Sequence, residues 1–219
     1  MNNDALLEKI QNQIPNFRDL AEFNQSYIKP NMIYRSSSPI FYQSLELLED
    51  FRSLGIRNIM DLRSSIEIGN SSYDDFFISE IKYNWIHLDI SFPPYIMAEK
   101  GLTHLSLYKQ FCWYTLFYNK VQIRKIFSLL ADDLSYRIII HCHAGRDRTG
   151  VISSLILLLM RAPVVNIIQD YLATDALTKS EDIEYILKMV EEVGGINTYL
   201  NDCGIDGAVQ QKIRQYLQP

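Results

Sequence analysis

The sequence predicts an α/β fold in which a central, mostly parallel β-sheet is flanked by helices. Short apolar runs rich in β-branched residues alternate along the chain with longer segments whose apolar residues recur at helical spacing. Strands that alternate with helices favour a parallel sheet. No internal repeat or Gly/Ser-rich linker divides the 219 residues, and 47% of them are hydrophobic, which is enough for a sizeable core. We therefore expect residues 1–219 to form a single domain.

The first half of the chain is predicted to begin with an amphipathic helix, followed by an extended segment at residues 27–35 with a turn at 29–31. Residues 44–54 have helical periodicity, and Gly55 ends this helix because glycine readily adopts the left-handed conformation that follows a helix. Residues 56–62 and 82–88 are rich in residues that favour β-structure, so they are predicted to be strands.

The second half is predicted to be mostly helical around one strand. Residues 103–131 have apolar residues at helical spacing, with an interruption near Asn119. The apolar run at 138–142 predicts the central strand of the sheet. Helices follow to the end of the chain, with Pro163 beginning one of them and Gly194 ending another.

The most informative segment is HCHAGRDRTG at residues 141–150. Cys142 and Arg148 are separated by five residues, a predicted strand precedes them, and an apolar helical run at 151–160 follows. A tight loop between a strand and a helix N-terminus binds anions, because successive backbone N–H groups and the helix dipole point at one position. A sulfur nucleophile and a guanidinium at the two ends of such a loop indicate chemistry on a phosphate ester.

The residue types in this loop suggest individual roles. The helix N-terminus favours the thiolate of Cys142, which is the candidate nucleophile, and Arg148 can hold two phosphoryl oxygens with its planar guanidinium. Thr149 can donate its hydroxyl to the departing sulfur, and His141 can orient the strand end. A cysteine on a strand is more often an ordinary core residue, but the loop glycines and the strand–helix context favour catalysis. The predicted phosphate-binding residues are His143, Ala144, Gly145, Arg146, Asp147 and Arg148.

This segment resembles the His-Cys-x-Ala-Gly-x-Asp-Arg-Thr-Gly signature of bacterial tyrosine phosphatases with dual protein and phosphoinositide activity. Further segments resemble motifs of the same family, so the resemblance covers nearly the whole chain. They are Asn-Phe-Arg-Asp-Leu at 16–20, Tyr-Arg-Ser at 34–36, Asp-Leu-Arg with a later Glu at 61–67, Asp-Tyr-Leu at 170–172 and Gly-Ile-x-x-Tyr-Leu at 195–200. The resemblance implies a cysteine-phosphatase-like sandwich.

Two positions depart from the family pattern. Arg146 stands where the family often has lysine, a base associated with recognition of phosphoinositides, so the charge is kept and its geometry changes. Ala21 and Glu22 stand where a Gly-Gly pair often follows the N-terminal motif, which affects the local turn and not the loop.

Two aspartates are candidates for the general acid and base. Asp147 lies inside the loop, beside the anion that Arg148 would hold, and the resemblance also favours it. Asp89 follows a predicted strand, at the place where other cysteine phosphatases carry a mobile acid loop. The alternative is a structural role, with Asp89 capping a helix or strand end and Asp147 pairing with a nearby arginine. We favour Asp147 and keep both.

Arginines and an aromatic segment outside the loop have two interpretations each. Arg18, Arg35 and Arg63 can line a substrate pocket, but pairing with Asp19, Asp61 or Glu67 to hold the scaffold is the preferred interpretation. The aromatic-rich segment at residues 92–120 is a candidate helical lid, while aromatic residues at this spacing are equally typical of an ordinary core.

The predicted function is hydrolysis of phosphate monoesters through a phosphocysteine, with phosphotyrosine proteins or peptides as expected substrates. A dual-specificity or phosphoinositide phosphatase is the alternative, and a non-catalytic phosphate-binding module is a further one. The chemistry needs no cofactor, and His87, His104 and His143 lack metal-ligand spacing. The net charge of −5 argues against nucleic-acid binding, and no run reaches the ~18 apolar residues of a membrane span.

The cysteine content and the N-terminal segment bear on the compartment. Cys112, Cys142 and Cys203 do not suggest a disulfide framework, and a reactive thiolate needs a reducing compartment. The N-terminal segment lacks a secretory pattern. A cytoplasmic location is therefore expected, and export without a cleaved signal stays open. The sequence does not reveal the oligomeric state.

Overall fold

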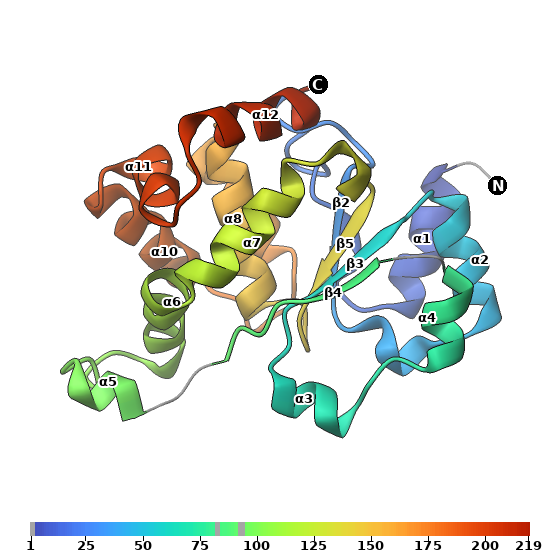
Figure 1. The fold of residues 1–219 in the computed structure, drawn as a ribbon, viewed down its shortest axis with the longest axis horizontal. Helices are drawn as coiled ribbons and strands as arrows, with labels where there is room; N and C mark the ends of the chain where they lie inside the picture. The colour runs from blue at the N-terminus through green and yellow to red at the C-terminus, as the bar shows by residue number, and fades with distance from the viewer. Residues whose placement is uncertain (1–2, 82–83, 92–94) are drawn as a thin grey trace.

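A twisted sheet forms the centre of the molecule (Figure 1). The computed structural model describes residues 3–81, 84–91 and 95–219. Within these residues the sheet has five strands in the order β1-β2-β5-β3-β4, and all neighbouring pairs are parallel except β1 and β2. The strands are β1 (Arg18–Asp19), β2 (Ile33–Ser36), β3 (Asn58–Asp61), β4 (Asn84–His87) and β5 (Ile138–His141). The predicted α/β class with a mostly parallel sheet is confirmed.

Helices cover both faces of this sheet (Figure 1). One face is covered by α1 (Asn3–Gln13), α2 (Leu45–Ser53) and α4 (Asp75–Ile81). The other face is covered by α6 (Leu107–Tyr118), α7 (Lys120–Leu130), α8 (Asp147–Leu159), α9 (Val164–Leu172), α10 (Ser180–Glu192), α11 (Gly195–Asp202) and α12 (Gly207–Leu217). Short helices α3 (Ser65–Asn70) and α5 (Tyr95–Glu99) lie beyond the strand ends, and two 3₁₀ turns are η1 (Pro39–Tyr42) and η2 (Asp133–Ser135).

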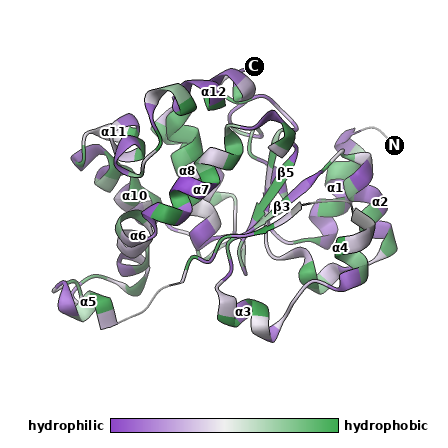
Figure 2. Cartoon of the chain, in the orientation of Figure 1, coloured by the Kyte–Doolittle hydropathy of each residue, from purple (hydrophilic) through white to green (hydrophobic). Residues whose placement is uncertain are grey.

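Strand β5 contributes to two separate hydrophobic cores. Ile138 and Ile140 belong to the larger core on the α8 side, whereas Ile139 belongs to the core on the α2 side. Successive side chains of a strand point to opposite faces, so a strand with both faces covered is apolar throughout. Figure 2 accordingly shows β5 and α8 in hydrophobic colours. This doubly buried strand leads directly into the segment at 142–146.

Several predicted elements are confirmed and others are wrong or missing. Helix α2 begins after the Ser44 cap and ends before Gly55, and Asn119 separates α6 from α7, as expected. The predicted extended segment at 27–35 is wrong for residues 27–32, most of which form turns and bends, and only Ile33–Ser36 pairs with the sheet. The turn expected within it is present at residues 30–31. Helices α3 and α4 were not predicted. Residues 82–83 of the predicted strand lie outside the described residues.

The candidate lid segment forms α5, a connecting loop and α6. Residues 92–94 lie outside the described residues. Cys112 and Leu116 of α6 are completely buried in the larger core, so much of this segment is structural. Helix α5 is five residues long and exposes Tyr95, although Met97 is buried. Closure of this segment over the loop stays a prediction.

Candidate functional site

The segment at 142–146 lies at the carboxyl ends of β2, β5 and β3, which is where parallel sheets bind ligands. Three of its carbonyl groups are held by the surrounding scaffold. The Ser38 N–H donates to the His143 carbonyl at 2.9 Å, Asn16 Nδ2 to the Ala144 carbonyl at 2.8 Å, and Arg35 to the Gly145 carbonyl at 3.0 Å. The C=O and N–H of a peptide unit point in opposite directions. The N–H groups that follow these carbonyls therefore point to the inside of the loop, as an anion site requires.

Gly145 allows the loop to pass close to β2. Its φ is +70°, in the left-handed region that glycine adopts without strain. A Cβ atom here would lie 2.3 Å from the Ser36 carbonyl oxygen, too close for any side chain. Position 145 therefore requires glycine, because any side chain would collide with the backbone at the end of β2.

His141 fixes the backbone at the candidate nucleophile. Its Nδ1 lies 3.0 Å from the Cys142 carbonyl oxygen, and its Nε2 lies 2.9 Å from the Tyr73 hydroxyl. A carbonyl only accepts, so Nδ1 carries the proton and Nε2 accepts from Tyr73. Burial, with the nearby Arg63 and Arg148 charges, lowers the pKa of His141 below its usual 6.5 although Asp61 opposes this. The neutral ring thus orients the strand end, and the Cys142 side chain after it is only 2% exposed.

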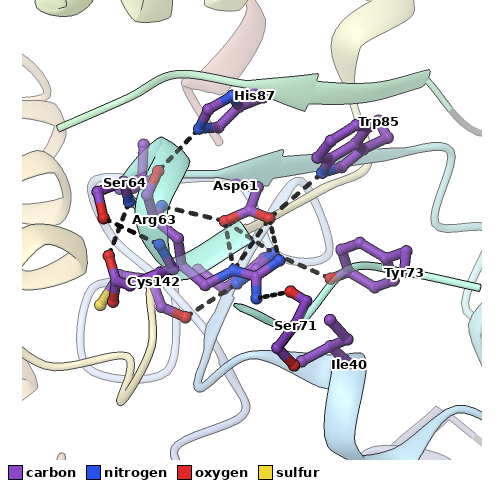
Figure 3. Close-up of polar contacts among 12 residues, drawn as sticks. Ile40, Asp61, Arg63, Ser64, Ser71, Tyr73, Trp85, His87 and Cys142 are labelled. Atoms are coloured by element: carbon purple, nitrogen blue, oxygen red, sulfur yellow. Dashed lines mark hydrogen bonds and ion pairs between the residues drawn. The ribbon is translucent and has the colours of Figure 1, made fainter. Parts of the chain in front are cut away.

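A buried ion pair at the end of β3 supports the same region (Figure 3). Arg63 Nη2 lies 2.7 Å from Asp61 Oδ2, and Trp85 Nε1 donates to the same oxygen at 3.3 Å. Burial opposes ionisation, but the charge that His141 acquires in acid and the Arg63 guanidinium together lower the pKa of Asp61 to about 2. The predicted pairing of Arg63 with Asp61 is confirmed. Arg63 is completely enclosed and its guanidinium is directed at scaffold groups, including the Ser71 carbonyl at 2.8 Å.

Arg148 is held by Glu67 in a two-bonded arrangement. Arg148 Nη1 and Nη2 lie 2.5 Å and 2.7 Å from the two carboxylate oxygens of Glu67, and Nη1 also donates to the Leu62 carbonyl. Burial raises the pKa of Glu67, but Arg148 and the Ser64 N–H outweigh it and lower the pKa to about 2. A bidentate pair fixes the plane of the guanidinium.

The sequence analysis missed this role of Glu67, although a signal was present. Ser64 and Glu67 form a capping box at the start of α3, in which the Ser64 Oγ accepts from the Glu67 N–H and the Ser64 N–H donates to the Glu67 carboxylate. The Ser-x-x-Glu pattern predicts such a box. It would have located α3 and would have placed Glu67 at the end of β3, close to the loop.

Arg18 and Arg35 do not pair with the predicted acids. Both bind Asp170 of α9, with Arg18 Nε at 3.0 Å from its Oδ1, and both donate to the Thr174 hydroxyl. Asp19 instead accepts from the Ala21 and Asn31 N–H groups. The scaffold role is confirmed but the partners are corrected, because the acid comes from a helix distant in sequence. Burial, then the neighbouring Arg35, lowers the pKa of Arg18 to about 10.

A pocket of about 350 Å³ opens beside the loop. Asp147 and Arg148 line it together with the apolar Ile66, Ile90 and Phe111. Its other lining residues are Ser64, Glu67 and Ser91. The pocket therefore combines one guanidinium, two carboxylates and an apolar wall.

Asp89 does not line that pocket. Its Oδ2 accepts hydrogen bonds from the Ser65 N–H at 3.0 Å and from the Ser65 hydroxyl at 2.5 Å. This arrangement is the helix-capping role that the sequence analysis gave as its structural alternative. Asp147 is the aspartate that the structure places beside Arg148.

The remaining loop residues differ in what they face. Arg146 Nε lies 3.1 Å from Asp147 Oδ1, and its Nη1 lies 3.6 Å from Asp175 Oδ2. His143 is exposed and packs edge-on against Phe41, pointing out of the loop. Thr149 is completely buried, and its Oγ1 has no hydrogen-bond partner in the part of the chain that the structure describes.

Among residues 3–81, 84–91 and 95–219, no group of three or more His, Cys, Asp or Glu side chains is arranged to hold a metal ion. Over the same residues, no helix has both the length and the apolar character needed to cross a membrane.

Comparisons with known proteins agree with this geometry. A tyrosine-protein phosphatase from Nostoc commune is 26% identical over 121 residues, which are 54% of this chain and only 40% of that protein. The chain thus spans well under half of that curated relative. The solved structure of the Siw14 catalytic core shares the fold, with a TM-score of 0.50 and 16% identity over 85% of this chain and 95% of that one. The model of the tyrosine phosphatase family matches residues 11–218, and the chain therefore belongs to this family.

Proposed function

We propose that this chain hydrolyses phosphate monoesters through a phosphocysteine at Cys142. The observation that carries the proposal is the loop itself: the scaffold binds three of its carbonyl groups, Cys142 begins it, and Glu67 fixes Arg148 at its end. In the first step the Cys142 sulfur attacks phosphorus, an S–P bond forms and the P–O bond to the leaving group breaks. In the second step water attacks phosphorus, the S–P bond breaks and phosphate leaves. The loop N–H groups and Arg148 stabilise the charge on the equatorial oxygens.

Asp147 is the proposed proton-transfer group. It lines the pocket next to Arg148, whereas Asp89 is bound to Ser65 and does not line it. Asp147 would protonate the leaving oxygen in the first step and accept a proton from water in the second. Thr149, with its unpartnered buried hydroxyl, is proposed to donate to the sulfur as the S–P bond breaks.

Phosphotyrosine in proteins or peptides is the proposed substrate. The apolar wall formed by Ile66, Ile90 and Phe111 beside Arg148 suits an aromatic ring. Arg146 already faces the carboxylates of Asp147 and Asp175, which leaves less positive charge for the extra phosphates of a phosphoinositide. The reducing environment that a thiol nucleophile needs supports a cytoplasmic location.

Covalent trapping tests the proposed reaction. Rapid quenching of the wild-type protein with an aryl phosphate should give one phosphate per chain on Cys142, and Cys142→Ser should abolish both the adduct and turnover. Turnover by Cys142→Ser at the wild-type rate would contradict the phosphocysteine mechanism, whereas a wild-type protein that binds phosphate without turnover or adduct would be a phosphate-binding module only. Rates on phosphotyrosine peptides are expected to exceed those on phosphoinositide vesicles, and the reverse order would favour the lipid phosphatase.

Comparison of two aspartate variants tests the proton donor. Asp147→Asn should lower kcat on an alkyl or phenyl phosphate by about 100-fold, a typical contribution of general acid catalysis. The loss should shrink with p-nitrophenyl phosphate, because its leaving group needs little protonation. Asp89→Asn should change kcat less than Asp147→Asn on both substrates, and the opposite order would reassign the acid to Asp89.

A further inference from the structure

A second cavity, of about 510 Å³, lies at the opposite end of α8 from the loop. Helix α8 has 13 residues and begins at Asp147, so this end is about 20 Å from the candidate active site. Figure 1 shows α12 beside this end of the helix. Most of the residues that line it have a hydrogen-bonding side chain, including Tyr27, Arg161, Gln211, Arg214, Gln215 and Gln218. No aspartate or glutamate is among the described residues that line it.

Arg161 occupies a backbone position that normally belongs to glycine. It follows the Met160 cap of α8 with a φ of +62°. Its N–H donates to the Leu158 carbonyl at 3.0 Å, and the Ala162 N–H donates to the Leu157 carbonyl at 3.0 Å. These two bonds define the Schellman motif, in which the left-handed residue is usually glycine. An arginine there carries a conformational cost that glycine avoids.

The positive charge at this cavity is not neutralised by an acid. Among the residues that the structure describes, neither Arg161 nor Arg214 forms an ion pair with a carboxylate. Arg214 is held in place by bonds from Nε to the Leu159 carbonyl at 3.0 Å and from Nη2 to Asn197 Oδ1 at 2.5 Å. Burial, then the charge of Arg161, lowers the pKa of Arg214. Favourable interaction with the helix C-terminus accounts for one cation here, but it does not account for a second arginine on the same lining, where Arg161 is exposed and Arg214 is half-buried.

We propose that this cavity is an oxyanion-binding site for a phosphate group, with Arg161 and Arg214 as the charged contacts. Guanidinium groups form charge-assisted bonds with phosphate oxygens, and the surrounding glutamine amides add neutral donors. The cavity exceeds the size of one phosphate ion, so it accommodates either free phosphate or a phosphate carried on a small organic group or peptide side chain. This site does not depend on the loop being catalytic.

Residue-resolved titration tests the proposal, because phosphate is expected at the catalytic loop as well. In NMR spectra of the ¹⁵N-labelled full chain, inorganic phosphate should shift two sets of amide signals. The first set comes from residues 143–148, and the second set comes from Tyr27 and Gln211–Gln218. Arg161→Gly should weaken the second set at least tenfold and leave the first unchanged. This variant should keep or slightly raise its thermal midpoint, since glycine suits a left-handed position. Lys212→Gln, which removes one charge from α12 outside the cavity lining, should change either set less than twofold.

Two arms distinguish the sources of the phosphate group. Inorganic phosphate represents the free ion, and a phosphoserine peptide represents a phosphorylated partner. The site is supported if either ligand binds saturably and if Arg161→Gly weakens that binding. The ligand that binds more tightly identifies the source of the phosphate group. Signal changes confined to residues 143–148, or equal binding by wild type and Arg161→Gly, would overturn the proposal.

Discussion

At the scale of the single residue, Glu67 has two structural roles. Its carboxylate closes the capping box of α3 and also holds both terminal nitrogens of Arg148. A guanidinium held on one side by a fixed carboxylate presents its remaining N–H groups in one direction, so the phosphate meets an arginine that is already oriented. Orientation before binding reduces the entropic cost of assembling the transition state.

We expect Glu67→Gln to lower kcat/KM on a phosphotyrosine peptide by roughly 10-fold to 100-fold, because misplacement of a positioned group has effects of this order. Glutamine keeps the cap interaction with the Ser64 N–H but loses the charged bond to Arg148. Ser64→Ala is the matched control, since it weakens the same helix start while leaving the carboxylate. Steady-state kinetics on the two variants measures the difference. Equal losses would mean that the helix, and not the carboxylate, positions Arg148.

At the scale of the element, Asp170 ties α9 to two strands and to the loop. It binds Arg18 of β1 and Arg35 of β2, and Arg35 also donates to the Gly145 carbonyl. All three charged side chains are almost completely buried. The loop conformation therefore depends on a helix that begins more than a dozen residues after it.

Asp170→Asn should destabilise the protein by about 3–5 kcal/mol, because it leaves two buried arginines without a compensating charge. This is a large part of the ~5–15 kcal/mol by which a domain is stable. Urea unfolding followed by Trp fluorescence measures the change. Thr174→Val removes only a neutral partner of the same arginines, so its expected cost is about 1 kcal/mol. If both variants lower the free energy of unfolding by similar amounts, the charge of Asp170 does not contribute to stability as proposed.

Prediction from the sequence succeeded for features that adjacent residues determine. It failed for features that depend on contacts between residues distant in the chain. Ile138–Ile140 and the following loop could be identified because strand, glycine and helix signals are adjacent in the chain. The pairing of Arg18 and Arg35 with Asp170 could not, because it joins residues more than 130 positions apart. Helix α3 was missed since no residue of it is buried, so it has no apolar stripe to detect.

At the scale of the whole molecule, titratable groups under the loop make the folding stability sensitive to acid. The folded pKa values of Asp61 and Glu67 are about 2, below their ordinary 3.8 and 4.5, and that of His141 is below 6.5. A depressed folded pKa means that the unfolded chain binds the proton more tightly. The stability from these groups is therefore complete above pH 6.5 and is lost as the pH falls toward 2.

Urea unfolding at pH 7, 5, 4 and 3 should give a free energy of unfolding that decreases at each step. Asp61 alone accounts for about 1 kcal/mol of this loss, because pH 3 lies between its folded pKa of about 2 and its ordinary 3.8. In Glu67→Gln the decrease between pH 5 and 3 should be smaller than in wild type. A free energy that stays constant from pH 7 to 3 would contradict the assigned ionisation states.

The position of β5 between two cores limits how the molecule can be divided. Ile139 belongs to the same core as Leu6 and Ile10 of α1, while Ile138 and Ile140 belong to the core that extends to Leu217 of α12. A fragment that keeps the signature segment but lacks either end would expose one face of the strand that presents it. Split-protein reporters or circular permutants of this chain should therefore be cut in exposed connections such as residues 100–106 and should retain both ends. A shorter fragment chosen by motif alone is expected to aggregate.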